Sequence, residues 1–338
     1  MGSTANLSGP TTALMDMTRE LATPSPGMPP ASPRSGASRS AAPRRLRLLR
    51  ALHAQPHRYP RLRWVGQSVT FLVLYGAPLL GLARFDLWDG RHFAAGRPAG
   101  LVYGLGALFI GVFSFYIITF VLNAALGRIF CGFGCPIGQA SRLGDDVEAA
   151  LATGHERLAA RARAAAFALA LAAGIALWLV SPRVFVEGSA RAVLVTLGGV
   201  AGLATLIYLH GRFWRWRFCQ DYCPIGIYYS AVQTAHGFGI HFDAASGTCK
   251  DCGSCDLVCP VDLHPRDLSR PKEGLGGIAI DGFPEESHCL TCGECVRACE
   301  NQYRKEGREL VPLRLSLHAV RRPQSEPPRP PPRTPVAR

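Results

Sequence analysis

The sequence predicts an α-helical membrane bundle followed by a small α+β domain. Three observations lead to this fold class. Four long spans without charged side chains lie between residues 64 and 211, two cysteine motifs of identical spacing lie between residues 249 and 299, and both chain ends are basic. The length of 338 residues suits two or three domains.

The four uncharged spans predict four transmembrane helices. They are residues 64–83, 98–127, 164–182 and 192–211. Each span is long enough to cross a hydrocarbon core about 30 Å thick. The second is longer than necessary, so we expect its helix to cover residues 101 to about 126. The charged segment before the third span has helical spacing, and we expect it to run straight into that span. Buried helices of a soluble core are the alternative, which four such spans disfavour.

Arginine placement predicts the orientation. Seven arginines lie between residues 44 and 63, five between 128 and 163, and three directly after the fourth span. The two opposite loops carry three and two arginines. Because positively charged loops stay in the cytoplasm, both termini and the later cysteine motifs are expected on the cytoplasmic side.

The net charge of +13 comes from the two ends of the chain. Residues 1–63 carry ten arginines against two acidic side chains, and residues 321–338 carry five against one. We therefore expect a disordered basic tail at residues 1–60, a disordered Arg- and Pro-rich tail at residues 313–338, and no nucleic-acid partner.

Two cysteine motifs, at residues 249–259 and 289–299, each read C-x2-C-x2-C-x3-C. This spacing is typical of bacterial ferredoxins with two [4Fe–4S] clusters, in which the fourth cysteine of each run binds the other cluster. The predicted ligand sets are Cys249, Cys252, Cys255 and Cys299 for one cluster, and Cys259, Cys289, Cys292 and Cys295 for the other. Zinc ribbons lack this doubled spacing, and a disulfide framework is unusual in the cytoplasm. We assign a ferredoxin-type domain to residues 237–312 and the transmembrane domain to residues 61–236.

A second set of cysteines follows the second and fourth spans. Cys131 with Cys135, and Cys219 with Cys223, both belong to a repeated F-C-x3-C-P-I-G sequence. The repeat predicts two equivalent helical hairpins, with the proline opening a helix in each. Cys135 and Cys223 would then lie at helix N-termini, where the dipole favours a thiolate. The four thiolates could bind a further cluster or a soft metal such as Cu(I) or Zn. Redox dithiols and inert cysteines are the alternatives, and the choice among cluster, metal and redox thiol stays open.

With both cysteine sets, residues 44–312 resemble the membrane-anchored polyferredoxin family. The chain is similar to the FixG/CcoG-type accessory protein of cytochrome oxidase assembly. It also resembles the quinol-dehydrogenase membrane subunit of periplasmic nitrate reduction (NapH-type) and the membrane half of the nitrous-oxide-reduction regulator (NosR-type). The resemblance implies a multi-pass protein of the bacterial inner membrane, with redox partner proteins and in some branches quinol.

Three functional hypotheses follow. The first is an electron-transfer component that relays electrons through two [4Fe–4S] clusters at the cytoplasmic face to a redox partner, rather than a stand-alone enzyme. The second is an oxidase-assembly or metal-handling factor that reduces copper at the C-x3-C-P cysteines. The third is a membrane scaffold or sensor whose clusters report oxygen.

The predicted orientation can be tested with reporter fusions. A reporter fused after Val320 should behave as cytoplasmic, and one inserted near Ala95 as periplasmic, because of the arginine bias. Activity of a periplasmic reporter at the C-terminal fusion would show that a span has been miscounted.

Overall fold

Long helices and two small sheets make up most of the described chain. The computed structural model describes Arg45, Leu48 and Leu52, and residues 57–154, 156–232, 238–243, 249–279, 281–307 and 311–317. By its contacts the chain divides into Met1–Ala42 and Pro43–Arg338, and every described residue belongs to the second unit. Most of the expected N-terminal tail and residues 318–338 of the expected C-terminal tail lie outside the described residues.

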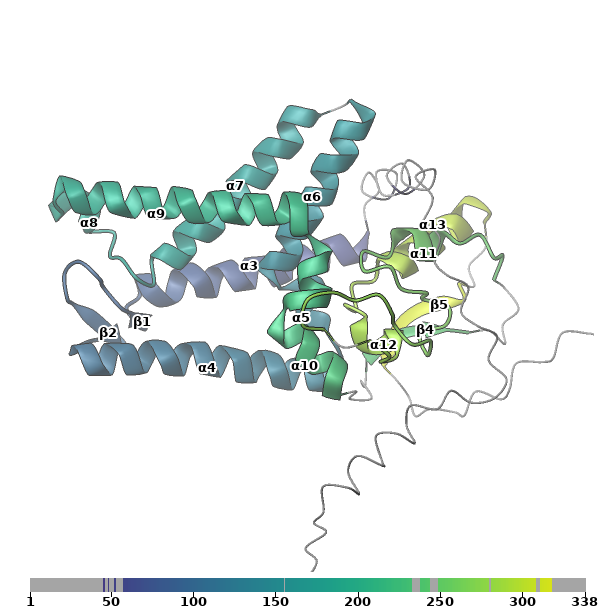
Figure 1. The fold of residues 1–338 in the computed structure, drawn as a ribbon, viewed down its shortest axis with the longest axis horizontal. Coiled ribbons are helices and arrows are strands. Elements are labelled where there is room, and N and C mark those ends of the chain that lie inside the picture. Colours follow the sequence, from purple (N-terminus) through teal and green to yellow (C-terminus); the bar gives the residue numbers. More distant parts are fainter. Residues whose placement is uncertain are drawn as a thin grey trace, which may run out of the picture. The chain divides into compact units, whose positions relative to one another are not determined.

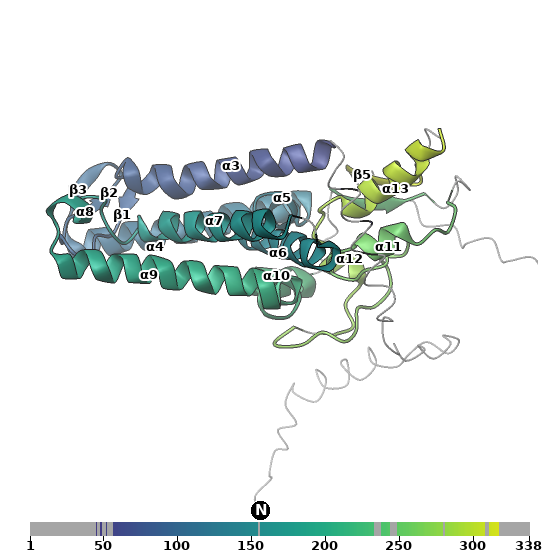
Figure 2. The ribbon, with the colours of Figure 1, turned by 90° about the horizontal axis from the view of Figure 1, so that it is seen from above.

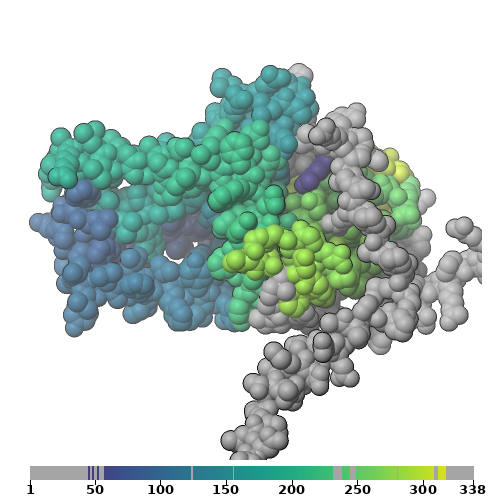
Figure 3. All heavy atoms as spheres, viewed as in Figure 1, coloured from purple at the N-terminus to yellow at the C-terminus, as the bar shows by residue number. Residues whose placement is uncertain are grey.

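Four long helices, α3 (Arg58–Leu79), α4 (Leu101–Leu126), α7 (Arg157–Ala176) and α9 (Ala190–Leu209), run along one another (Figures 1 and 2). Three segments of the described chain are long and apolar enough to cross a membrane: Leu101–Leu122, Arg157–Ala176 and Ala190–Trp214. Helix α4, whose bounds match the expected ones, exposes Phe109, Ile110 and Phe113. The segment that contains this helix lies along the lower edge of the face drawn in Figure 3. These apolar helices indicate a membrane protein.

The helix that contains the first predicted span is not among the three candidate spans of the described chain. Helix α3 ends at Leu79, and Ala83 belongs to strand β1 (Ala83–Arg84), so the expected bound at residue 83 is wrong. The first half of α3 carries Arg61, Arg63 and Gln67, and two of these side chains bond to backbone carbonyls beside the cysteines. A fourth transmembrane helix therefore stays a prediction.

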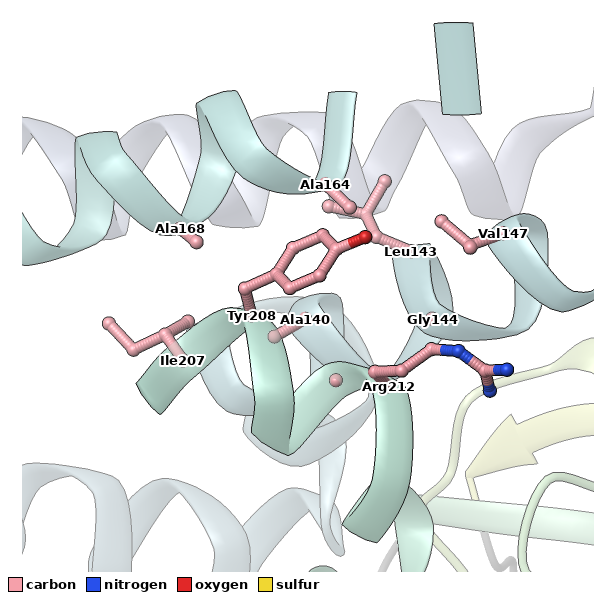
Figure 4. A pocket seen from close by; sticks show the side chains of 10 residues that line it. Ala140, Leu143, Gly144, Val147, Ala164, Ala168, Ile207, Tyr208 and Arg212 are labelled. Carbon is pink, nitrogen blue, oxygen red and sulfur yellow. The ribbon is translucent and has the colours of Figure 1, made fainter. Parts of the chain in front are cut away.

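Small side chains let helices α6 (Pro136–Thr153), α7 and α9 approach closely. The residues where the three meet are drawn in Figure 4: Ala140, Leu143, Gly144, Val147, Ala164, Ala168, Ile207, Tyr208 and Arg212. A Cβ on Gly144 would lie 1.7 Å from the backbone oxygen of Gly211. Small residues that bring backbones together are typical of helix pairs in membranes.

The charged segment before α7 does not run straight into it. Helix α6 ends where Gly154 takes a left-handed backbone with φ of 78°, and α7 begins at Arg157. A glycine with positive φ satisfies the last carbonyls of a helix and lets the chain turn. The expectation of one continuous helix is therefore wrong.

The loop between α3 and α4 folds into a sheet that the sequence did not predict. Strands β1, β2 (His92–Ala94) and β3 (Arg97–Ala99) pair antiparallel in that order. A buried carboxylate, Asp86, accepts from the backbone N–H groups of Trp88, Asp89 and Ser181. Ser181 precedes the short helix α8 (Val184–Glu187), so Asp86 ties this loop to the one between α7 and α9.

The C-terminal part is a small α+β unit. Strand β4 (Phe238–Phe242) pairs antiparallel with β5 (Leu313–Leu317), and helices α11 (Ser254–Val258), α12 (Glu285–His288) and α13 (Glu294–Lys305) lie between them in sequence. Ile240, Val258, Val296 and Leu313 form its core together with Leu52 and Tyr59.

This core corrects both expected tail boundaries. Residues 313–317 form β5 because their apolar side chains complete the core, so the expected disordered tail cannot begin at residue 313. At the other end, residues 58–60 begin α3 rather than closing a disordered tail, and Leu52 is only 1% exposed. Buried apolar surface stabilises both segments.

Replacing Gly144 by alanine tests the close approach of α6 to the end of α9. We expect Gly144→Ala to lower stability by about 1–3 kcal/mol, because the added methyl group collides with the backbone at Gly211. Gly198→Ala is the matched control, since a Cβ there meets nothing within 4 Å. Thermal unfolding in detergent measures both, and equal midpoints for the two variants would contradict the close contact.

Candidate metal centres

Eight of the twelve cysteines line two pockets. One pocket is lined by Cys249, Cys252, Cys255 and Cys299, with Phe242, Tyr303 and Leu313 among its other residues. The second is lined by Cys259, Cys289, Cys292 and Cys295, with Leu263 and Leu268 beside them. Each pocket thus combines three cysteines of one motif with the fourth cysteine of the other, which is the grouping that the spacing predicts.

The two motifs share one local backbone conformation. The residue before the second cysteine has a positive φ in both, 58° at Asp251 and 52° at Thr291. The glycine after the second cysteine also has a positive φ, 65° at Gly253 and 74° at Gly293. Glycine enters this region without strain. Helices α11 and α13 start directly after these glycines, so the third cysteine of each motif lies in a first helical turn.

Backbone N–H groups face two of the sulfurs. The amide of Leu263 donates to Cys259 Sγ over 3.3 Å, and the amide of Thr291 donates to Cys289 Sγ over 3.4 Å. Donors of this kind stabilise negative charge on sulfur, and they tune the potential of a bound iron–sulfur cluster.

The two pockets differ in burial. Cys249 and Cys252 are exposed, whereas Cys259, Cys292 and Cys295 are buried. Burial raises the pKa of the Cys289 thiol to about 12, so the unligated thiol is protonated at neutral pH. Metal binding at this pocket must therefore displace protons. The first pocket is open to solvent, and the second is closed.

The two C-x3-C-P turns have the same local structure. Cys135 directly precedes α6, which begins at Pro136, and Cys223 directly precedes α10 (Pro224–Val232). The prediction that each proline opens a helix is confirmed. A Cβ on Gly138 would lie 3.0 Å from the carbonyl oxygen of Cys131, and one on Gly226 would lie 2.5 Å from that of Cys219. The sequence repeat is therefore also a repeat in local backbone packing.

Burial outweighs the helix N-terminus at Cys135. Backbone hydrogen bonds from Gly138 and Ile137 lower the pKa of its thiol, but desolvation raises the pKa by more. Burial likewise raises the pKa of Cys131 to about 12. The donors at the helix N-terminus thus favour the thiolate, but the net effect in the unligated protein is a raised pKa of the Cys135 thiol.

A buried arginine joins the two turns. Arg128, three residues before Cys131, donates to the backbone oxygen of Gly226, three residues after Cys223. It also donates to Ser230 Oγ over 2.9 Å, and Ser230 Oγ lies 3.2 Å from His288 Nδ1, next to Cys289. The side chain of Arg128 is only 2% exposed.

A second contact joins the turns near the end of α9. There the chain passes through two π-helical segments, η1 (His210–Trp214) and η2 (Phe218–Tyr222). Between them, the indole of Trp216 donates to Asp145 Oδ2 of α6 over 2.7 Å, and Arg215 pairs with the same carboxylate over 3.2 Å. The approach to Cys219 is therefore fixed to the helix that follows Cys135.

Both C-x3-C-P turns touch the backbone of the buried pocket. A Cβ on Gly132 would lie 2.6 Å from the oxygen of Leu290 and 3.0 Å from the Cα of Cys292. On the other turn, Gln220 Nε2 donates to the oxygen of Val261 over 2.6 Å, two residues after Cys259. Cys131 and Cys219 pack in one hydrophobic cluster with Cys259 and Cys292. Cys131 and Cys219 therefore lie beside the second pocket.

A buried ion network fixes this arrangement. Glu294, next to Cys295 and 3% exposed, pairs with Arg63 of α3 over 2.5 Å and with Arg142 of α6 over 3.4 Å. Arg63 also donates to the oxygen of Cys292 over 2.9 Å. Three elements that are far apart in sequence thus meet at one carboxylate.

Sequence reasoning missed Arg128, Glu294 and Arg63 as site residues. Arg128 stands just before a cysteine motif, but a basic residue at the end of a membrane span ordinarily faces lipid headgroups. Nothing in the sequence distinguishes it from its neighbours, since its role depends on a contact 98 residues away.

Within the described residues, no group of three or more His, Cys, Asp or Glu side chains is arranged to hold a metal ion. In a [4Fe–4S] cluster each cysteine binds a different iron, so the four sulfurs lie farther apart than the ligands of one ion. The two four-cysteine pockets therefore offer the thiol ligands of an iron–sulfur cluster. Their sulfurs are not grouped as closely as the ligands of a single metal ion.

Two known proteins are similar in sequence. The chain is 24% identical over 304 residues to the nitrogen fixation protein FixG of Rhizobium meliloti strain 1021, covering 75% of this chain and 54% of FixG. It is 23% identical over 193 residues to an uncharacterized protein of Methanocaldococcus jannaschii, covering 54% of this chain and 74% of that protein. The chain thus spans about half the length of FixG. These identities support at most a common family.

No protein-family profile matches the chain, and no solved structure matches it.

The Glu294 network predicts a large stability difference between two charge variants. We expect Glu294→Gln to cost about 3–5 kcal/mol, because it leaves buried guanidinium groups without their counter-charge. Arg58→Gln is the control: its partner Glu300 directly follows the second motif, but the Arg58 side chain is 62% exposed and the pair is worth about 0–1 kcal/mol. Chemical unfolding in detergent measures both. Equal losses would mean that the buried network does not hold the second motif in place.

Proposed function

We propose that the chain is a membrane-bound iron–sulfur protein that relays electrons to a redox partner through two [4Fe–4S] clusters. One cluster belongs in the pocket lined by Cys249, and the other in the pocket lined by Cys289. The observation that carries the proposal is the grouping of eight cysteines into two crossed sets of four.

The residues of both pockets fit such clusters. Thiolates are the soft ligands that iron–sulfur clusters prefer. The positive φ angles at Gly253 and Gly293 provide the tight turns between ligands, and the amides of Leu263 and Thr291 point at sulfur. A bound cluster accepts and releases single electrons without forming a bond to a substrate.

The difference in burial suggests a role for each pocket. The pocket with exposed Cys249 and Cys252 is open to a soluble partner, and the buried pocket lies against the C-x3-C-P turns at the ends of membrane helices. Electrons would therefore pass between a membrane-side site and a soluble protein. A quinol on the membrane side would give up two electrons, one at a time, and release two protons.

The cellular location of the chain and its family are further parts of the proposal. The arginine bias supports a cytoplasmic location of both pockets and both termini in a bacterial inner membrane. The similarity to FixG supports the same family at most, and FixG is named only for nitrogen fixation. The proposed domains are residues 61–236 for the membrane part and 237–317 for the part that holds the clusters.

A second candidate function is copper handling. The observation that favours it is the approach of the two C-x3-C-P turns beside the second pocket, where Cys131 and Cys219 pack in one cluster. In this function one electron from a reduced cluster would convert Cu(II) to Cu(I), a soft ion that thiolates bind well. Copper that co-purifies in a ratio of one per chain, and that a Cys219→Ser variant loses, would support it.

Serine substitutions test the two-cluster proposal. Cys252→Ser and Cys292→Ser should each lower the iron content and remove one EPR signal of the reduced protein, because a hydroxyl binds iron poorly. Cys299→Ser should damage the cluster of the first motif more than that of the second. Retention of about eight irons per chain in all three variants would contradict the assignment, since each cluster holds about four.

A further inference from the structure

We infer that Cys131, Cys135, Cys219 and Cys223 hold a third [4Fe–4S] cluster, and that buried Arg128 balances its negative charge. This inference rests on the proposed function and adds a metal centre to it. It follows from the shape of the two turns, from the spacing of the thiols, and from an unusual buried cation.

The two C-x3-C-P turns supply four thiols in a closed, apolar place. Each turn presents one cysteine in a short helical segment and a second immediately before a longer helix. The hydrogen bond from Arg128 to Gly226 brings the two turns together. Trp216 and Leu290 pack around Cys131 and Cys219, which are partly buried.

The spacing favours a cluster over a single ion. Cys131 and Cys219 pack in one cluster, and the hydrogen bond from Arg128 to Gly226 joins the two turns that also carry Cys135 and Cys223. The four thiols still do not form a group suited to one metal ion, among the residues that the structure describes. The two ferredoxin-type pockets have the same property. A cubane cluster fits thiols that lie near one another without being grouped around one ion, because its four cysteines each bind a separate iron.

Arg128 is the observation that points to an anionic ligand. Its side chain is 2% exposed, and none of the ion pairs found among the described residues includes it. The Nη2 atom donates to Gly226 and Ser230, but the buried Nε–H group has no hydrogen-bond partner. A buried charge without a counter-charge is very unfavourable.

The anionic groups that Arg128 faces are sulfurs. Arg128 stands three residues before Cys131, donates to Gly226 just after Cys223, and reaches His288, next to Cys289, through Ser230. Four protonated thiols would leave the guanidinium uncompensated. Four thiolates around a [4Fe–4S] core carry a net negative charge, and their sulfurs can accept the free Nε–H hydrogen bond.

The third centre would lie next to the second. The Gly132 backbone contacts that of Cys292, and Arg128 faces sulfurs of both sites. The three centres would then form a row, with the solvent-open pocket at one end and the membrane-side centre at the other.

Metal analysis of the full chain, purified anaerobically in detergent, tests the inference. We expect about twelve irons and twelve sulfides per chain, since each cluster holds about four of each. Cys131→Ser and Cys219→Ser should each leave about eight irons. Both variants should keep the EPR signals that Cys252→Ser and Cys292→Ser remove. Cys131 and Cys219 belong to different turns. An equal loss of iron in both variants would therefore not be explained by misfolding of one of them.

The same experiment separates failure of this inference from failure of the proposed function. About eight irons in the unaltered chain, unchanged in Cys131→Ser, would overturn the third cluster and leave the two-cluster relay standing. One copper or zinc per chain that Cys219→Ser removes would overturn it as well. Absence of the eight ferredoxin-type irons would instead overturn the proposed function.

Substitution of Arg128 tests its role through a reduction potential. In an EPR-monitored redox titration, Arg128→Gln should move the potential of the third centre to a more negative value than Arg128→Lys does. Without a nearby positive charge, adding an electron to an anionic centre is less favourable. Arg217→Gln is the control, because that side chain is close in sequence but 78% exposed. Equal potentials in the Gln and Lys variants, with iron retained, would overturn the charge-balancing role.

Discussion

The arrangement of the candidate centres depends on one buried carboxylate. Glu294 stands beside the third cysteine of its motif and binds Arg63 from the first long helix and Arg142 from the helix after Cys135. Buried ion pairs contribute little net stability compared with apolar packing, but they tolerate only a narrow geometry. Such a constraint suits electron transfer, because the rate of that process depends on fixed distances between centres. Helices and cysteine loops are therefore joined at the position where relative placement matters most.

Polarity divides the helices according to what they touch. Helix α4 exposes aromatic and aliphatic side chains along most of its length, whereas α3 begins with arginines that reach the cysteine loops. Helices that run beside one another (Figure 2) therefore differ in how apolar their surfaces are. The C-terminal unit also depends on residues far before it in the chain, because Leu52 and Tyr59 belong to its core.

The sequence predicted features that are written in short-range patterns. Cysteine spacing gave the two groups of four, the C-P dipeptide gave the starts of α6 and α10, and uncharged length gave the bounds of α4. Features that depend on long-range contacts were missed. Arg128 acts through a partner 98 residues away, and strand β5 forms only because β4 lies beside it. Gly154 was overlooked as a break, although a single glycine with positive φ is enough to end α6.

The crossed grouping of cysteines has a consequence for biosynthesis. The surface pocket needs Cys249 and Cys299, and the buried pocket needs Cys259 and Cys295. The buried set is therefore complete only when the ribosome reaches Cys295, in the first turn of α13, and the surface set only at Cys299, midway along that helix. By then every long helix has emerged, and 85 residues separate Trp214, the end of the candidate span Ala190–Trp214, from Cys299. Insertion of the helices into a membrane would thus precede loading with iron and sulfide. The machinery that delivers clusters would have to act on a chain already anchored at the membrane surface.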